Sequence, residues 1–269
     1  FVQRPLRWLT AVSKYRATHS GGPNFAFDLA VDRITPAQRE HLDLSAWETA
    51  YNGSEPVRKS TLDRFARTFA SCGFAARTHV PAYGLAEATL LVASKRTGEE
   101  VNCRTAPEFA PQAQRIGSAA NVTRDIVSCG PAVLDTTIEI VDPASGLPMS
   151  AGTVGEIWVR SPGVALGYWH RTQATEEVFA ARLTGPRDNA GGFLRTGDLG
   201  FVDNGELYVT GRIKDVIIIR GQNHYPHDIE QTIQESDEAL ERGNGAAFGI
   251  MLDGEEHIVV VQEVSRTSM

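Results

Sequence analysis

Two charged residues in the last third of the chain have the types and spacing to bind a nucleotide. Asp198 lies in the segment 193–200, and Arg212 lies near the start of the segment 211–230. A carboxylate can accept hydrogen bonds from two ribose hydroxyls, and a guanidinium carries a fixed fork of donors that suits ribose and phosphate oxygens. We expect a short strand, 207–209, between them. Each segment alone would be an ordinary turn, so the prediction rests on their order and spacing.

A second candidate segment is Tyr83-Gly-Leu-Ala-Glu87, which follows a predicted strand. Gly84 leaves room for a ring to approach closely beside Tyr83. Glu87 offers the oxygen ligands that Mg²⁺ prefers. The structural alternatives are a core tyrosine at a strand end and a solvated glutamate at the start of a helix.

Together these segments resemble the adenylate-forming superfamily, which activates carboxylates as acyl-AMP. The sequence of residues 221–230, Gly-Gln-Asn-His-Tyr-Pro-His-Asp-Ile-Glu, is most similar to that of fatty-acyl-AMP ligases. This resemblance implies an enzyme that joins a long-chain fatty acid to ATP, with Mg²⁺, and passes the acyl group to an acyl carrier protein or a polyketide synthase carrier domain. Two alternatives stay open: a long-chain acyl-CoA synthetase, and a non-catalytic relative that uses the fold for binding or structure.

The resemblance also implies roles for individual residues. Asp198 would take both ribose hydroxyls, Arg212 would be a catalytic contact to ribose and phosphate, and Tyr83 would stack on adenine. Glu87 would be catalytic by holding Mg²⁺, and Lys214 would be the hinge of a rotating C-terminal domain. The remaining nucleotide-binding candidates are Asn52, Gly53, Ser54, Glu55 and Gly84. The acyl-binding candidates are Ser20, Gly21, Asn24, Phe25 and Ala86.

The order of predicted elements indicates an α/β protein. Residues 1–211 are expected to be the C-terminal part of a large domain, with a parallel sheet and covering helices over 1–90 and a small β-rich subdomain at 131–211. The polar stretch 92–127 is interpreted as an insertion. In the family, the ligases that do not use CoA as the acyl acceptor carry an insertion at this place. Residues 212–269 are expected to begin a small, mobile α+β domain.

Periodicity and breaker residues predict the individual elements. A helix is expected after Pro5, and another from an N-cap at Ser60 to Gly73. Segment 17–27 is expected to be a strand that runs into a loop, and the Trp and Tyr residues of 155–169 are expected in the core. The other predicted elements are strands at 44–52, 137–141, 156–160, 207–209, 216–219 and 257–264, and a helix at 226–235.

Composition narrows the class of protein. The 269 residues are 42% hydrophobic and 22% charged, which is typical of a soluble globular protein. The net charge of −7 argues against broad nucleic-acid binding, which needs a basic surface. No apolar run is long enough to span a bilayer, and no signal peptide is recognised. Cys72, Cys103 and Cys129 have neither zinc nor redox spacing, which indicates a reducing cytoplasm.

Two features of the family are missing from the sequence. The first is a Gly/Ser/Thr-rich phosphate loop with a lysine, and the second is the catalytic lysine of the C-terminal domain. The chain begins at Phe1 and stops at Met269, just after an apolar strand. We expect both ends to be cuts through a larger protein, with the phosphate loop before Phe1 and the family's C-terminal catalytic lysine after Met269. The chain alone is then expected to bind nucleotide weakly and to adenylate inefficiently.

Overall fold

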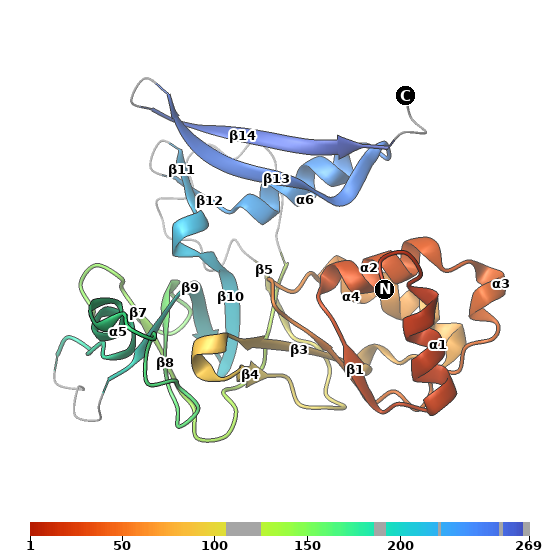
Figure 1. Ribbon diagram of the computed structural model, residues 1–269, viewed down its shortest axis with the longest axis horizontal. Helices are drawn as coiled ribbons and strands as arrows, with labels where there is room; N and C mark the ends of the chain where they lie inside the picture. The colour runs from red at the N-terminus through yellow and green to blue at the C-terminus, as the bar shows by residue number, and fades with distance from the viewer. Residues whose placement is uncertain (106–124, 186–191, 220–221, 253–254, 266–269) are drawn as a thin grey trace.

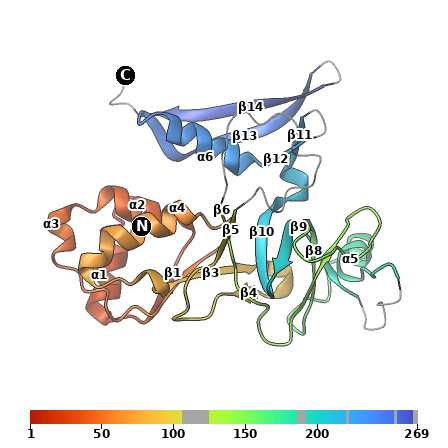
Figure 2. The same cartoon turned by 180° about the vertical axis from the view of Figure 1, so that it is seen from behind.

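The structure is a computed structural model that describes residues 1–105, 125–185, 192–219, 222–252 and 255–265. Figure 1 shows a helical end in red and orange, a first sheet beside it, a second sheet in green and cyan, and a blue C-terminal unit above both. The view from behind shows the same order (Figure 2). No helix within the described ranges is long and apolar enough to cross a membrane.

The first sheet contains three parallel strands and one antiparallel strand. Its strands are β1 His19–Gly21, β2 Thr49–Asn52, β3 His79–Gly84 and β4 Leu91–Ser94. They lie in the order β1-β2-β3-β4, and only the β3–β4 pair is antiparallel. The predicted parallel sheet of residues 1–90 is therefore confirmed. Strand β2 is shorter than the predicted 44–52, because 44–48 is a turn that buries Trp47 in the core.

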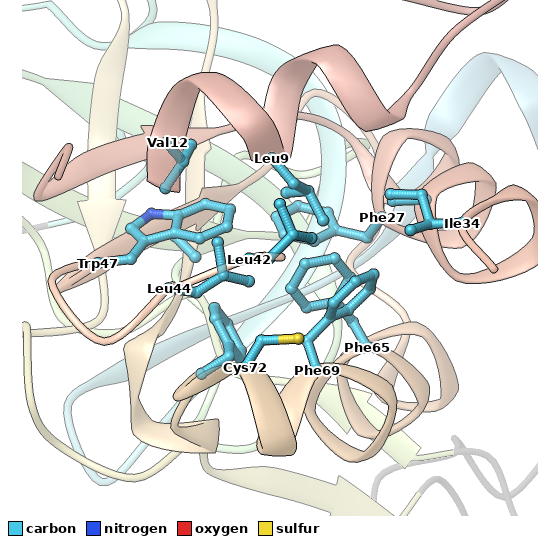
Figure 3. Packing of buried hydrophobic residues seen from close by; sticks show 13 residues of the cluster. Leu9, Val12, Phe27, Ile34, Leu42, Leu44, Trp47, Phe65, Phe69 and Cys72 are labelled. Atoms are coloured by element: carbon cyan, nitrogen blue, oxygen red, sulfur yellow. The ribbon is translucent and has the colours of Figure 1, made fainter. Parts of the chain in front are cut away.

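Helices cover this sheet and form the core of the N-terminal end. They are α1 Leu6–Tyr15, α2 Asn24–Arg33, α3 Pro36–Arg39 and α4 Lys59–Phe69, followed by the 3₁₀ turns η1 Ala70–Cys72 and η2 Ala76–Thr78. Phe65 and Phe69 lie four residues apart, so both point from one face of α4 into the core (Figure 3). Phe65 meets Phe27 of α2 edge to face, with ring centroids 5.0 Å apart.

Two predictions about local structure in this region need correction. Ser60 does not cap α4, because the helix begins at Lys59 and its N-cap residue Arg58 makes no side-chain capping bond. The α-helix itself ends at Phe69, and Gly73, with φ 87°, closes the 3₁₀ turn η1 that continues from it. Segment 17–27 is a short strand followed by a helix rather than a loop. Pro23 directly precedes α2, where a missing N–H costs nothing.

The second sheet is antiparallel throughout, in the order β10-β9-β8-β7. Its strands are β7 Thr137–Val141, β8 Gly155–Arg160, β9 Leu194–Asp203 and β10 Glu206–Arg212, and helix α5 Thr172–Phe179 packs near β9. Strand β9 was not predicted, and β10 is longer than 207–209. Trp158 is buried as expected, but Tyr168 and Trp169 are exposed, so the core prediction for them was wrong.

The predicted insertion 92–127 begins within β4, and residues 106–124 lie outside the described residues. Its described flanks pair as an antiparallel ladder of β5 Cys103–Thr105 and β6 Asp125–Val127. Arg104 of β5 forms an ion pair with Asp203 of β9, with Nε and Oδ2 2.6 Å apart. The flanks of this segment are therefore fastened to the second sheet.

The C-terminal unit follows β10 after one 3₁₀ turn. Its elements are η6 Ile213–Asp215, β11 Ile217–Ile219, β12 Gln222–His224, α6 Pro226–Ser236, β13 Leu240–Leu252 and β14 Glu255–Val264. Helix α6 begins with Pro226, as predicted. It packs on the β13–β14 hairpin, where the Ala247 N–H donates to Glu230 Oε1 at 2.9 Å. The division of the chain at 211/212 into two domains stays a prediction.

Candidate functional site

Asp198 joins the two sheets through its carboxylate. Its Oδ2 accepts a hydrogen bond from the Tyr83 hydroxyl at 2.7 Å, and its Oδ1 accepts one from Arg212 Nε at 2.9 Å. Tyr83 belongs to β3, Asp198 to β9 and Arg212 to β10, so two consecutive strands of the second sheet meet a strand of the first sheet that lies 115 residues earlier in sequence. Each carboxylate oxygen keeps a further lone pair, so the group can still accept two ligand hydroxyls.

Irregular strand pairing sets the position of Asp198. On one side, residues 196–198 of β9 oppose the single residue Ile157 of β8. On the other side, Thr210 of β10 is the extra residue between the pairs Val209–Gly200 and Gly211–Leu199. Such bulges redirect side chains and are frequent beside ligand sites. Directly after the second bulge, Arg212 and Asp198 are cross-strand partners, which explains their contact.

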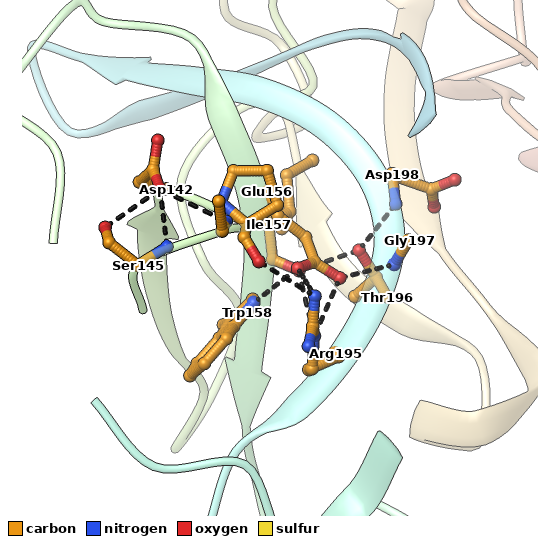
Figure 4. A network of polar contacts seen from close by, with 11 residues as sticks. Asp142, Ser145, Glu156, Ile157, Trp158, Arg195, Thr196, Gly197 and Asp198 are labelled. Carbon is orange, nitrogen blue, oxygen red and sulfur yellow. Dashed lines mark hydrogen bonds and ion pairs between the residues drawn. The ribbon is translucent and has the colours of Figure 1, made fainter. Parts of the chain in front are cut away.

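A buried glutamate supports the bulge of β9 that carries Asp198 (Figure 4). Glu156 of β8 is 2% exposed and accepts bonds from the Trp158 indole at 2.9 Å and from Arg195 at 2.8 Å. Its Oε1 also accepts from the Gly197 N–H at 3.2 Å. Gly197 has φ 71°, a conformation that favours glycine. Glu156 therefore fixes the backbone one residue before Asp198, a role the sequence analysis did not find.

Tyr83 is mainly a core residue whose hydroxyl faces Asp198. The side chain is 8% exposed and packs with Ala93, Cys129 and Leu207. Burial and the Asp198 carboxylate hold the pKa of Tyr83 well above its ordinary value, so the phenol stays protonated as a donor. Stacking of an adenine on this ring stays a prediction.

Arg212 is placed to reach an anionic ligand. Its side chain is 66% exposed, whereas the Asp198 side chain is 9% exposed. Its hydrogen bond to Asp198, with the charge of that carboxylate, raises the pKa of Arg212. With Nε directed at Asp198, the two terminal amino groups remain donors for a phosphate.

Glu87 lies on a short 3₁₀ turn, η3 Ala86–Ala88, directly after β3. Gly84 is required before this turn, because a Cβ there would lie 1.7 Å from the Leu90 carbonyl oxygen. The need for glycine is therefore structural, in addition to any approach of a ligand ring. The Glu87 Oε1 accepts a hydrogen bond from the Tyr168 hydroxyl at 2.8 Å. Ala86 is exposed on the same turn.

The segment 52–55 forms a turn at the end of β2. Asn52 is fully buried, and its Nδ2 donates to Asn24 Oδ1 at 3.1 Å. Ser54 is exposed with φ 72°, and Gly53 lies where a Cβ would be 2.8 Å from the Ala82 carbonyl oxygen. Glu55 is half-buried. The turn is thus held close to β3, beside the predicted nucleotide site.

Asn24 supports this turn rather than standing free for an acyl chain. Its Nδ2 donates to the Pro56 carbonyl at 2.9 Å, and its Oδ1 also accepts from the Arg58 N–H at 3.1 Å. Ser20 Oγ accepts from the Trp8 indole at 2.8 Å. Phe25 is 50% exposed, on the outer side of α2. A role of these residues in acyl binding stays a prediction.

The ends of the parallel strands bring the candidates to one edge of the first sheet. Gly21 ends β1, Asn52 ends β2 and Gly84 ends β3. Because β1, β2 and β3 are parallel, these ends face the same way. Ligands of such sheets bind outside the carboxyl ends of the strands. Lys214 lies two residues beyond Arg212, exposed in η6.

Glu87 can supply one carboxylate ligand to a magnesium ion. Within the described ranges, no group of three or more His, Cys, Asp or Glu residues could hold a metal ion. Mg²⁺ commonly takes one or two carboxylates and completes its shell with water and substrate phosphates. The single carboxylate of Glu87 is therefore a sufficient protein ligand only for a metal that arrives with a nucleotide.

Comparisons with known proteins identify the family of this chain. Residues 1–169 match the family model described as AMP-binding enzyme. The chain is 48% identical to the medium-chain-fatty-acid–acyl-carrier-protein ligase JamA of Moorena producens, over 99% of this chain and 46% of that protein. It is 43% identical to the similarly named ligase TtuA of Teredinibacter turnerae, over 99% of this chain and 43% of that protein.

A solved structure, that of the fatty acyl-adenylate ligase from L. pneumophila in complex with acyl adenylate and pyrophosphate, is also similar. It has a TM-score of 0.76 and 44% identity, and the match covers 100% of this chain and 47% of that one. The chain thus spans less than half the length of these relatives. With a family model matched over more than half of its residues, the chain belongs to the AMP-binding enzyme family.

Proposed function

We propose that the intact protein activates a fatty acid with ATP to an acyl-adenylate and then transfers the acyl group to the thiol of a carrier protein. The observation that carries this proposal is the bridge from Tyr83 through Asp198 to Arg212, which joins two sheets in a member of this family. The names of the relatives JamA and TtuA support the acceptor, since both are acyl-carrier-protein ligases.

The first step needs positioning more than reactive side chains. The fatty-acid carboxylate attacks the α-phosphorus of ATP, an acyl–phosphate bond forms, and pyrophosphate leaves with the electron pair of the broken bond. Asp198 would hold the ribose hydroxyls, and Arg212 would donate to ribose and phosphate oxygens, where negative charge develops. Glu87 would hold Mg²⁺, which when bound stabilises charge on the phosphate oxygens.

The acyl side of the site is proposed along the edge where β1 and β2 end. Gly21 is needed for the packing of β1 on β2, because a Cβ there would be 2.0 Å from the Tyr51 carbonyl oxygen, so its place on the acyl path rests on the family resemblance. Ser20, Phe25 and Ala86 would line the chain's path. The relatives are named for medium-chain fatty acids, whereas the sequence suggested a long chain, so the length is left to measurement.

The test is product analysis by mass spectrometry with the intact protein. The protein is supplied with ATP, Mg²⁺ and an equimolar mixture of saturated fatty acids from six to sixteen carbons, with CoA and a holo-carrier protein offered separately. We expect acyl-AMP without an acceptor and acyl-carrier with the carrier. Acyl-CoA as the main product would identify the CoA-ligase alternative, and no acyl-AMP at all would identify the non-catalytic alternative. Asp198→Ala serves as the inactive control.

A further inference from the structure

Two hydrogen bonds fasten the turn that carries Glu87 to the loop 163–168, one between backbone groups and one from a threonine side chain. The Ala165 N–H donates to the Glu87 carbonyl at 2.8 Å. The Thr89 hydroxyl donates to the Gly163 carbonyl at 2.6 Å. These bonds hold the main chain of the turn and leave the Glu87 carboxylate free to rotate.

One further contact acts on the carboxylate itself. The Tyr168 hydroxyl donates to Glu87 Oε1 at 2.8 Å, across 81 residues of sequence. Burial, with a smaller contribution from Glu87, raises the pKa of Tyr168, so the phenol stays a donor. Among the described residues this contact engages Oε1, so Oε2 keeps its lone pairs for another ligand.

Tyr168 is in turn held by helix α5 and the residues before it. Its ring packs edge to face on Phe179, with centroids 5.0 Å apart, and its N–H donates to Thr175 Oγ1 at 3.0 Å. Gly167 permits this approach, because a Cβ there would lie 2.2 Å from the Thr175 methyl carbon. The Tyr168 side chain is therefore held in place by its contacts with helix α5.

We propose that Tyr168 is a positioning residue for the Glu87 carboxylate, holding Oε1 so that Oε2 points to a nucleotide-bound divalent cation. This inference rests on the proposed function, because the cation arrives with ATP. Hydrogen bonds to a ligating carboxylate orient it, and loss of such a partner typically lowers metal affinity about 10-fold to 100-fold. The Ala165 N–H and the Thr89 hydroxyl already fasten the loop to the turn, so among the described residues the Tyr168 hydroxyl is not needed to hold the loop in place.

The test compares Tyr168→Phe with the wild-type protein in two measurements. Phenylalanine keeps the packing on Phe179 and removes only the hydroxyl. We expect the Mg²⁺ concentration for half-maximal acyl-AMP formation to rise about tenfold, with the rate at saturating Mg²⁺ changed less than twofold. We also expect Mg²⁺ to improve ATP affinity less than in wild type, measured by calorimetry with Mg²⁺ and with EDTA. This second readout does not depend on turnover.

A matched control is Tyr208→Phe, which removes another tyrosine hydroxyl that donates to a glutamate, Glu206 Oε2, at 3.2 Å. Its Mg²⁺ dependence should equal that of wild type. In the double variant Glu87→Ala/Tyr168→Phe, the second change should add less than twofold, because the carboxylate that Tyr168 would position is gone.

An unchanged or lower Mg²⁺ requirement in Tyr168→Phe would overturn the proposal, as would full additivity in the double variant. If Tyr168→Phe lowers the melting temperature strongly and slows the reaction equally at all Mg²⁺ concentrations, the hydroxyl is structural and the proposal is wrong. A wild-type protein that makes no acyl-AMP contradicts the proposed function instead. In that case the calorimetric comparison still decides whether Tyr168 acts on the cation.

Discussion

Asp198 and Glu87 are carboxylates of one candidate site, yet the fold holds them in different ways. Asp198 lies inside a sheet strand, 6% exposed, with both oxygens hydrogen-bonded to other strands. Glu87 lies on a three-residue turn, half-buried, with one oxygen bonded to an exposed tyrosine. Two strand bulges and the buried Glu156 fix the position of Asp198. Only the Tyr168 hydroxyl is proposed to orient the carboxylate of Glu87.

This difference matches the ligands that we propose for them. Two ribose hydroxyls have a fixed separation, so their acceptor gains from being held rigidly before the ligand binds. A hydrated cation brings its own flexible shell of water and phosphate oxygens, so its protein ligand needs less rigidity. The contrast predicts that Asp198 contributes to ATP affinity with or without Mg²⁺, and that Glu87 contributes to it only when Mg²⁺ is present.

The largest expected effect is that of Asp198→Ala. It removes the acceptor of two charge-assisted hydrogen bonds, each worth about 1.5–3 kcal/mol, so acyl-AMP formation should fall roughly 10²- to 10⁴-fold. ATP affinity measured by calorimetry should fall with Mg²⁺ and with EDTA alike, while circular dichroism stays unchanged. Normal ATP affinity with normal turnover would rule out the ribose assignment.

Glu87→Gln is expected to act on the metal alone. An amide oxygen is a poorer ligand for Mg²⁺ than a carboxylate, so the half-maximal Mg²⁺ concentration should rise by roughly a factor of 100. ATP affinity in EDTA should equal that of wild type, in contrast to Asp198→Ala. If ATP affinity in EDTA falls for both variants, the proposed separation of ribose and metal roles between the two carboxylates is wrong.

Glu156→Gln tests whether rigidity matters at the Asp198 side. The change removes the charge that faces Arg195 and weakens the bond to the Gly197 N–H, and we expect the free energy of unfolding to fall by about 1–3 kcal/mol. The KM for ATP should rise about threefold to tenfold, since the bulge before Asp198 loses its support. Glu139→Gln on β7 is the matched control and should change neither value. A stability loss with an unchanged KM would show that Glu156 does not position Asp198.

The alternation of helices and strands over residues 1–90 predicted the parallel sheet. The sequence set Asp198 and Arg212 on either side of a short strand, but their direct contact follows from the pairing of β9 with β10 and was not predicted. Strand β9 was missed because Gly197 and Gly200 lower its strand propensity, and pairing on both sides overrides that propensity. Helix α2 was missed because Pro23 and two glycines before it favour a loop. The contact of Tyr168 with Glu87 spans 81 residues, and no local pattern encodes it.

The smallest expected effect on adenylation is that of Lys214→Pro. This variant tests whether the rigidly held region around Asp198 and Arg212 ends at residue 214. Lys214 is exposed in η6, two residues after Arg212, and a cleft of about 860 Å³ separates α2 and α4 from α6 and β13. Proline fixes φ near −65° and removes a backbone donor, so it should hinder rotation at this point. We expect acyl-AMP formation to change less than roughly threefold and transfer to the carrier thiol to slow at least about fivefold.

The two half-reactions of Lys214→Pro are timed separately, with Lys214→Ala as the control that removes the side chain and keeps the backbone free. If alanine slows transfer as much as proline does, the side chain rather than the backbone matters at this position. Equal slowing of both half-reactions by proline would indicate that the strand β10 and the turn η6 move together. The hinge would then lie beyond residue 215, and Arg212 would share in the motion that we assign to the C-terminal unit alone.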